Sequence, residues 1–160
     1  MHQFDLKNKT AIITGGAQGF GLDIAKRFLK SGTKAIIWDI DEEELKKAVK
    51  AVNDPNLSYN VVDVSVFKNV KDTVDEIAKS SNIDILINNA GITGSTSSLW
   101  DYDVAEWNKI IEINLMGTFN CCKCVVPYMI KNDYGRIVNV ASVAGKDGNA
   151  NASAYSSAKA

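Results

Sequence analysis

The chain has 160 residues, of which 46% are hydrophobic and 23% charged, enough to bury one substantial core. Its formal net charge of −1 argues against the basic surface typical of proteins that bind nucleic acid or anionic membranes. No apolar run approaches the ~20 residues of a membrane span, and the N-terminus has no apolar signal core, which favours a cytoplasmic protein. The only histidine is His2, so a mechanism with a positioned histidine base or a histidine-ligated metal is disfavoured, and no metal is expected.

Five short runs rich in valine and isoleucine predict strands that are buried on both faces. They occupy residues 10–14, 34–39, 57–63, 83–88 and 135–142. Segments with helical periodicity and helical start signals lie between them, at residues 19–31, 41–52, 66–79 and 103–129. After the fifth strand we expect a loop and then the first turns of a helix. This alternation predicts an α/β fold, a Rossmann doubly wound parallel sheet of order 3-2-1-4-5, in one domain over residues 1–160.

The first predicted strand leads directly into the glycine-rich segment TGGAQGFG at residues 14–21. Glycines at such a turn let the backbone approach a diphosphate, and the following helix offers free N–H groups and the positive end of its dipole. Because the motif stands between a strand and a helix in the first βαβ unit, it predicts dinucleotide binding. The expected contacts in this segment are Gly15, Gln18, Gly19, Phe20 and Gly21.

An acidic residue, Asp39, ends the second predicted strand, about 20 residues beyond the glycines. A carboxylate at this position accepts hydrogen bonds from both hydroxyls of an adenosine ribose and repels a 2′-phosphate. The glycine segment contains no Lys or Arg, and Ile40 follows the acid, so no cation is available there to neutralise a 2′-phosphate. We therefore expect NAD to be preferred over NADP.

Two features are interpreted as structural. Asn88, at the end of the fourth predicted strand, is expected to brace the sheet. The three cysteines of the segment CCKC, Cys121, Cys122 and Cys124, point to different faces of a helix, and no second cysteine pair is present to complete a zinc site. We expect these cysteines to pack in the core.

A second group of polar residues begins at the end of the fifth predicted strand. Ser142 closes that strand, Tyr155 lies thirteen residues later, and Lys159 lies four residues beyond Tyr155. Residues i and i+4 share a helix face, so the phenol and the ammonium can reach one site. A tyrosine with a free pKa of ~10 is a poor base near neutrality unless a neighbouring cation lowers that pKa. The pair therefore predicts acid–base chemistry at an alcohol or ketone oxygen.

These motifs resemble the short-chain dehydrogenase/reductase family, whose pattern includes TGxxxGxG at residues 14–21, NNAG at residues 88–91 and YxxxK at residues 155–159. The resemblance covers nearly the whole chain from about residue 6. It implies an NAD-dependent oxidoreductase that transfers a hydride to or from a small secondary alcohol or ketone, without a metal or a covalent intermediate. The nearest members are the 3-oxoacyl-carrier-protein reductases and related sugar or hydroxyacid dehydrogenases.

The resemblance also implies roles for individual residues. Tyr155 exchanges the proton and also contacts the cofactor, and Ser142 hydrogen-bonds the substrate oxygen. Lys159 lowers the pKa of Tyr155 and binds the nicotinamide ribose. The side chain of Asn114, in the segment EINLMGT, holds a water that links Lys159 to solvent. Further contacts with the adenosine half of the cofactor are implied for Asp63, Val64, Asn89 and Gly91.

Two alternative interpretations remain open. The fold of the family continues beyond this lysine, so we expect an incomplete domain with an uncovered fifth strand, and the chain would then be a remnant that binds NAD without turnover. A nucleotide-sugar epimerase or dehydratase also uses YxxxK, but its usual GxxGxxG spacing disagrees with Gly15, Gly19 and Gly21. A full-length parent protein is expected to form a homo-oligomer through its long helices.

Overall fold

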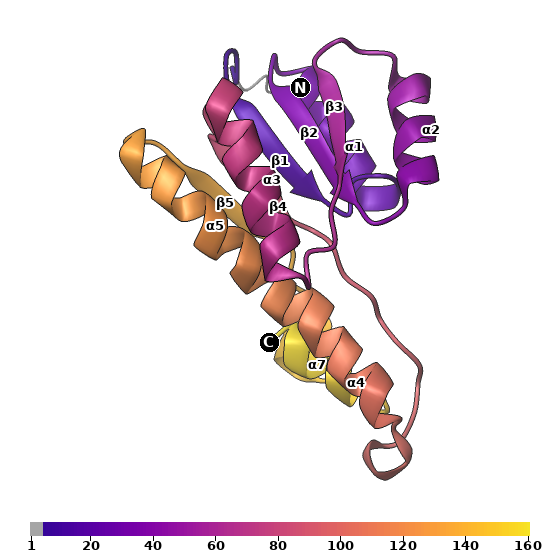
Figure 1. Cartoon of the computed structure of the whole chain (residues 1–160). Helices are drawn as coiled ribbons and strands as arrows, with labels where there is room; N and C mark the ends of the chain where they lie inside the picture. The colour runs from indigo at the N-terminus through magenta and orange to yellow at the C-terminus, as the bar shows by residue number, and fades with distance from the viewer. Residues whose placement is uncertain (1–4) are drawn as a thin grey trace.

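A parallel β-sheet forms the centre of the computed structural model, which describes residues 5–160 (Figure 1). Its strands are β1 (Thr10–Thr14), β2 (Lys34–Asp39), β3 (Leu57–Val61), β4 (Ile85–Asn88) and β5 (Arg136–Asn139). They follow the order β3-β2-β1-β4-β5 and pair in parallel throughout, as the alternation of elements predicts. The early prediction about His2 lies outside the described residues.

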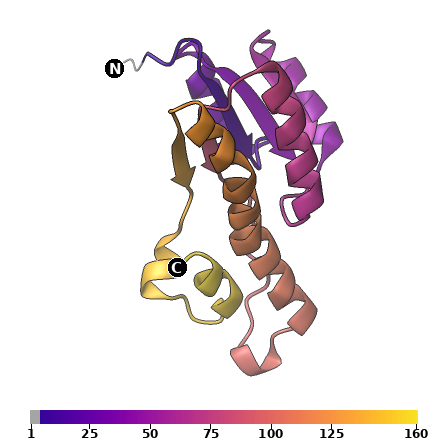
Figure 2. The ribbon, with the colours of Figure 1, turned by 60° about the vertical axis from the view of Figure 1, so that its left-hand side comes forward.

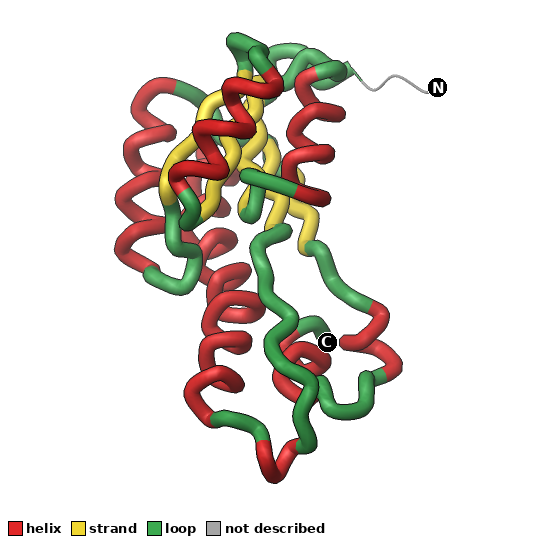
Figure 3. The backbone as a smooth tube through the Cα atoms, turned by 90° about the vertical axis from the view of Figure 1, so that its right-hand side faces the viewer, coloured by secondary structure: helices red, strands yellow, loops and turns green. Residues whose placement is uncertain are grey.

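Helices cover both faces of the sheet, as Figure 3 shows. They are α1 (Gly19–Leu29), α2 (Glu42–Val52), α3 (Phe67–Ser80) and α5 (Gly117–Lys131). Successive strand residues point to opposite faces, so Ile12 and Leu86 pack with α3 and α5, whereas Ile13 and Ile37 pack with α1 and α2. Because both faces are buried, the central strands are apolar in their interiors and carry polar residues only at their ends.

Capping residues set the beginnings of two helices. The carboxylate of Asp41 accepts a hydrogen bond from the backbone N–H of Glu44 at 3.0 Å and so caps α2. Asp103 accepts in the same way from the N–H of Glu106 at 2.8 Å and caps α4 (Val104–Ile111). Both starts agree with the sequence-based assignment.

The helix predicted over residues 103–129 is present as one uninterrupted helical run from Val104 to Lys131, but it is not α-helical throughout. Between α4 and α5 the chain forms a π-helical turn, η2 (Glu112–Met116), which contains the buried Asn114. A π turn inserts one residue into an α-helix, and such turns are common at functional sites.

Within residues 5–160, no helix combines the length and the apolar composition that crossing a membrane requires.

The region after the fifth strand also differs from expectation. β5 ends at Asn139, so Ser142 does not close the strand, and the segment expected to be a loop contains a short helix, α6 (Val143–Asp147). The reason is a cap: the Ser142 hydroxyl accepts a hydrogen bond from the N–H of Ala144 at 3.2 Å. The predicted C-terminal helix is present as α7 (Ser153–Ala158).

Helices α4, α6 and α7 lie beyond the carboxyl ends of the strands, with α7 beside α4 (Figures 1 and 2). A small apolar cluster joins α7 to α4 and to Tyr102, which follows the 3-10 turn η1 (Leu99–Asp101). Its buried members are Tyr102, Ile110, Ala154 and Ala158. This cluster fixes where the C-terminal helix, and therefore Tyr155, lies relative to the sheet.

The edge strand β5 is exposed along its length, and Ile137 and Val138 are 39% and 51% exposed. This confirms the expectation of an uncovered fifth strand. The strand is held to its neighbour by an additional side-chain bond, because the amide of Asn88 donates a hydrogen bond to Oδ1 of Asn139 at 2.8 Å. The bracing role predicted for Asn88 is thus confirmed.

The three cysteines of α5 are free thiols. Cys121 and Cys124 are buried in the core between the sheet and α3, and Cys122 is half-buried. Their expected packing role is therefore confirmed. Burial raises the pKa of Cys121 to about 12.

We predict that Cys121 resists alkylation in the folded protein. Because its pKa is raised, the reactive thiolate is scarce at mildly alkaline pH, and the buried sulfur is also inaccessible. Iodoacetamide treatment followed by mass spectrometry should show little modification of Cys121 in buffer and full modification in urea, with the half-buried Cys122 labelled first. Equal labelling rates of Cys121 in the two conditions would contradict its burial.

Candidate functional site

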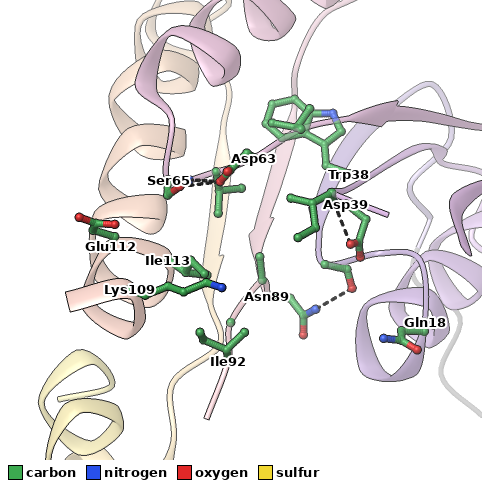
Figure 4. Close-up of a pocket in the computed structure, with 16 residues that line it drawn as sticks. Gln18, Trp38, Asp39, Asp63, Ser65, Asn89, Ile92, Lys109, Glu112 and Ile113 are labelled. Atoms are coloured by element: carbon green, nitrogen blue, oxygen red, sulfur yellow. Dashed lines mark hydrogen bonds between the residues drawn. The ribbon is translucent and has the colours of Figure 1, made fainter. Parts of the chain in front are cut away.

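A cleft of about 720 Å³ lies at the carboxyl ends of the strands, where the order of the sheet reverses between β1 and β4 (Figure 4). This is where open α/β sheets bind ligands, and the volume suits a small molecule or a cofactor. Seven residues predicted to contact the cofactor line it: Gly15, Gln18, Asp39, Asp63, Val64, Asn89 and Gly91. Residues that the sequence assigns to cofactor binding on four different strand ends therefore lie together at one cleft.

The glycine segment leaves room for a ligand beside the first turn of α1. Gly19 has a φ of +52°, and a Cβ atom added to it would meet nothing within 4 Å, so open space lies beside the backbone there. A Cβ on Gly21 would lie 2.2 Å from the carbonyl oxygen of Gly15, so only glycine permits this approach. The N-cap residue Gln18 makes no side-chain cap, which leaves amides of the first turn for an anion. These features fit the diphosphate of a dinucleotide.

Gly19, Phe20 and Gly21 do not themselves line the cleft. Gly21 is buried against Gly15 and Asn89, and the side chain of Phe20 is 75% exposed. The contribution of these residues to the cleft is therefore the backbone shape of the turn, and the cofactor contact expected of Phe20 stays a prediction.

A hydrogen-bonded junction ties the glycine segment to the end of β4. The hydroxyl of buried Thr14 accepts hydrogen bonds from the N–H groups of Asn89 at 3.0 Å and Ala90 at 2.9 Å, and donates to the carbonyl of Ile87 at 3.4 Å. In return, the Asn89 amide donates to the carbonyls of Thr14 at 3.0 Å and Gly15 at 3.1 Å. We call these two residues the Thr14–Asn89 junction, because together they fix the two sides of the cleft relative to each other.

Backbone N–H groups hold two carboxylates at the cleft. Asp39 accepts from the N–H of Ile40 at 2.8 Å and from that of Ala17 at 3.3 Å, so its side chain connects the end of β2 to the glycine segment. Asp63 accepts from the N–H and the hydroxyl of Ser65, at 2.9 and 2.6 Å. Asp41, not Asp39, caps α2. The carboxylate of Asp39 therefore remains at the cleft.

Asn114, in the π turn η2, clamps the segment that follows β4. Its Oδ1 accepts a hydrogen bond from the N–H of Ile92 and its Nδ2 donates to the Ile92 carbonyl, both at 2.8 Å. A Cβ added to Gly91 would lie 2.9 Å from Oδ1 of Asn114 and 3.4 Å from Nζ of Lys159. Gly91, which lines the cleft, is therefore the point where the cleft adjoins both side chains.

Lys159 reaches from the end of α7 to the end of β5. Its ammonium donates a hydrogen bond to the carbonyl of Val140 at 2.9 Å, and partial burial lowers its pKa below the ordinary value. Its backbone N–H donates to the carbonyl of Tyr155 at 3.1 Å, so the two residues are one helical turn apart, although α7 itself ends at Ala158. Tyr155 is half-buried against the small apolar cluster.

Several lining residues were not anticipated from the sequence. They are Trp38, Ile40, Val62, Ser65, Ala90, Ile92, Lys109, Glu112 and Ile113. The last three come from α4 and η2, and their only sequence signal was their position just before Asn114. Within residues 5–160, no three His, Cys, Asp or Glu side chains come together as a metal site would require.

Comparison with known proteins identifies close relatives of the chain. Residues 9–160 match the family model described as short chain dehydrogenase. The chain is 43% identical over 154 residues to a 2-dehydro-3-deoxy-L-rhamnonate dehydrogenase (NAD(+)) of Sphingomonas, covering 95% of this chain and 61% of that protein. It is 40% identical over 159 residues to a 3-oxoacyl-[acyl-carrier-protein] reductase of Chlamydia muridarum, covering 97% of this chain and 64% of that one.

Solved structures agree with the sequence matches. A crystal structure of NAD+-bound xylitol dehydrogenase superimposes with a TM-score of 0.91 at 35% sequence identity. The match covers 96% of this chain and 60% of that one. The chain thus spans roughly three fifths of the length of these relatives, as 61% and 64% coverage of the two sequences also indicates.

We predict that replacing Thr14 with valine destabilises the fold. The substitution Thr14→Val preserves the shape but removes the acceptor for the N–H groups of Asn89 and Ala90, and each buried unsatisfied group costs about 1–3 kcal/mol. Urea unfolding should show a loss of about 2–4 kcal/mol in the free energy of unfolding.

The matched control is Thr33→Val, because the Thr33 hydroxyl is equally buried but has no hydrogen-bond partner in the described part of the chain. This variant should be as stable as the unmodified protein or more stable. Similar losses in both variants would contradict the importance of the Thr14–Asn89 junction.

Proposed function

The chain belongs to the short-chain dehydrogenase family, and on that premise we propose that it is an oxidoreductase that transfers a hydride between NAD and a secondary alcohol or ketone. The observation that carries the proposal is the position of Gly91, which lines the cleft and also adjoins Asn114 and Lys159. We propose further that residues 1–160 belong to a single NAD-binding domain.

In this proposal the cleft binds the adenosine half of the dinucleotide. Asp39 accepts hydrogen bonds from the adenosine ribose, Asp63 and Val64 contact the adenine, and the amides at the start of α1 bind the diphosphate. The bound nicotinamide ring supplies or accepts the hydride. The NAD(+) in the name of the Sphingomonas relative supports the choice of NAD.

The chain itself supplies the proton transfer. The phenol of Tyr155 gives a proton to the substrate oxygen, or takes one from it, while Ser142 hydrogen-bonds the same oxygen. The ammonium of Lys159 binds the nicotinamide ribose, and its bond to Val140 holds it between the ends of β4 and β5. Asn114 positions this region through its clamp on Ile92 and connects Lys159 to solvent through a water.

The substrate in this proposal is a small hydroxylated or oxo compound. The names of the relatives cover a sugar-acid dehydrogenase and an acyl reductase, which share a secondary alcohol or ketone as the reacting group. For the whole protein we propose a homo-oligomer, because large apolar side chains on η2 and α5 are exposed at Leu115, Met116 and Phe119.

We predict that Tyr155→Phe abolishes turnover and preserves cofactor binding. Removing the phenol oxygen eliminates the proton donor, a loss of about 10²–10⁴ in rate, but leaves the cleft unchanged. NADH absorbance in the presence of sugar-acid and 3-oxoacyl ketones measures turnover, and NADH fluorescence titration measures binding.

The matched control is Tyr128→Phe, which removes a hydroxyl that bonds Asp75, away from the cleft, and should retain full activity. NADH binding by the unmodified chain without turnover of any ketone would contradict the proposed reaction. Turnover by Tyr155→Phe at the unmodified rate would contradict the role of this residue.

We predict that Asp39→Asn narrows the preference for NADH over NADPH. The substitution keeps the size of the side chain but removes the negative charge that repels a 2′-phosphate. In titrations with both cofactors, the unmodified chain should bind NADH more tightly than NADPH. The ratio of the NADPH dissociation constant to the NADH dissociation constant should be smaller for the variant. Asp41→Asn makes the same charge change at the cap of α2 and should leave the ratio unchanged. Tighter binding of NADPH by the unmodified chain would overturn the assignment.

A further inference from the structure

The charges around the cleft do not match an anionic cofactor. Three carboxylates line it, from Asp39, Asp63 and Glu112, against a single ammonium, from Lys109. The formal net charge of the lining is therefore −2, which opposes the binding of a diphosphate. The glycine segment at residues 14–21 adds N–H groups but no cation. Lys109 is thus the only formal positive charge among the residues that line the cleft.

Lys109 is placed to use that charge on a ligand. It lies on α4, and Figure 4 shows its ammonium directed into the cleft towards Asn89, on the opposite side from Gln18 and the glycine segment. Among residues 5–160 it has no hydrogen bond or ion pair, whereas Lys46 and Lys71 pair with acids on their own helices. Glu112, one turn later, points its carboxylate away from the centre of the cleft in Figure 4.

We propose that Lys109 binds the diphosphate of the dinucleotide from the side opposite the glycine segment. The first turn of α1 offers neutral N–H groups to one side of the diphosphate, and the ammonium offers a full charge to the other. A lysine suits this task because its flexible four-carbon stem lets a compact charge follow the ligand. This inference rests on the proposed function, because it assumes that the cleft holds NAD.

Lys109 also lies far from the position at which NAD and NADP differ. Asp39 lies across the cleft from Lys109 in Figure 4, and an adenosine ribose bound to Asp39 would carry its 2′ position on that far side. Lys109 therefore strengthens the binding of any dinucleotide without favouring a 2′-phosphate.

The test is NADH fluorescence titration of Lys109→Gln at low and high salt. At low salt the dissociation constant for NADH should rise about fivefold, as expected for a partly exposed ion pair, and the difference should shrink below about twofold in molar salt. Lys109→Arg should bind nearly as the unmodified chain does. The dissociation constant of adenosine, which carries no phosphate, obtained by displacement of NADH should be the same in the variant and in the unmodified chain.

The matched control is Lys131→Gln, which removes an exposed lysine from the far end of α5 and should not alter binding at any salt concentration. Thermal unfolding followed by circular dichroism should be the same for all variants, because neither lysine has a partner to lose among the described residues.

Four results would overturn the inference. Unchanged NADH affinity in Lys109→Gln would show that the ammonium makes no contact with the cofactor. If this variant lost as much affinity for adenosine as for NADH, the contact would be with the nucleoside. A larger loss for NADPH than for NADH would place it on the 2′-phosphate. Failure of the unmodified chain to bind NADH would overturn the proposed function, and this inference with it, whereas the first three results leave the proposed function intact.

Discussion

The Thr14–Asn89 junction is the constraint on which the rest of the site depends. In a parallel sheet the ladder fixes neighbouring strands, but the loops that leave the carboxyl ends have no such register. Here one hydroxyl and one carboxamide extend the pairing of β1 and β4 past the last ladder bonds, into the glycine segment and into the NNAG segment. The cleft therefore has two rigidly related sides before any ligand arrives, and a ligand bound there has less backbone to order.

Two regions of different construction meet at this cleft. One is the sheet with its helices, whose buried strands set the positions of Asp39, Asp63 and Asn89. The other is the layer formed by α4, α6 and α7, which carries Tyr155 on a six-residue helix that depends on tertiary packing for its order. Lys159 bridges them by its bond to Val140.

The sequence predicted the sheet order and the helix caps, because these follow from local periodicity and from residues at the ends of elements. It also named residues at strand ends, such as Asp39, that lie together at the cleft. It did not predict α6, since five residues rich in small side chains carry no periodic signal and only the cap at Ser142 starts the helix. It also missed Lys109 and Glu112, whose exposure to the cleft depends on how α4 crosses the strand ends. The π turn η2 was missed for a similar reason: such a turn is selected by tertiary contacts, in this case the Asn114 bonds to Ile92.

That π turn has a consequence for both ends of the long helix. One additional residue changes the angular phase of everything that follows by about 100° relative to an unbroken α-helix. In this phase, α4 presents Lys109 to the cleft and Ile110 to α7, while α5 still presents Cys121 and Val125 to the core. A helix that was α-helical throughout would lose one of these two alignments. The π turn therefore allows one long helix to pack against α7 at one end and against the core at the other.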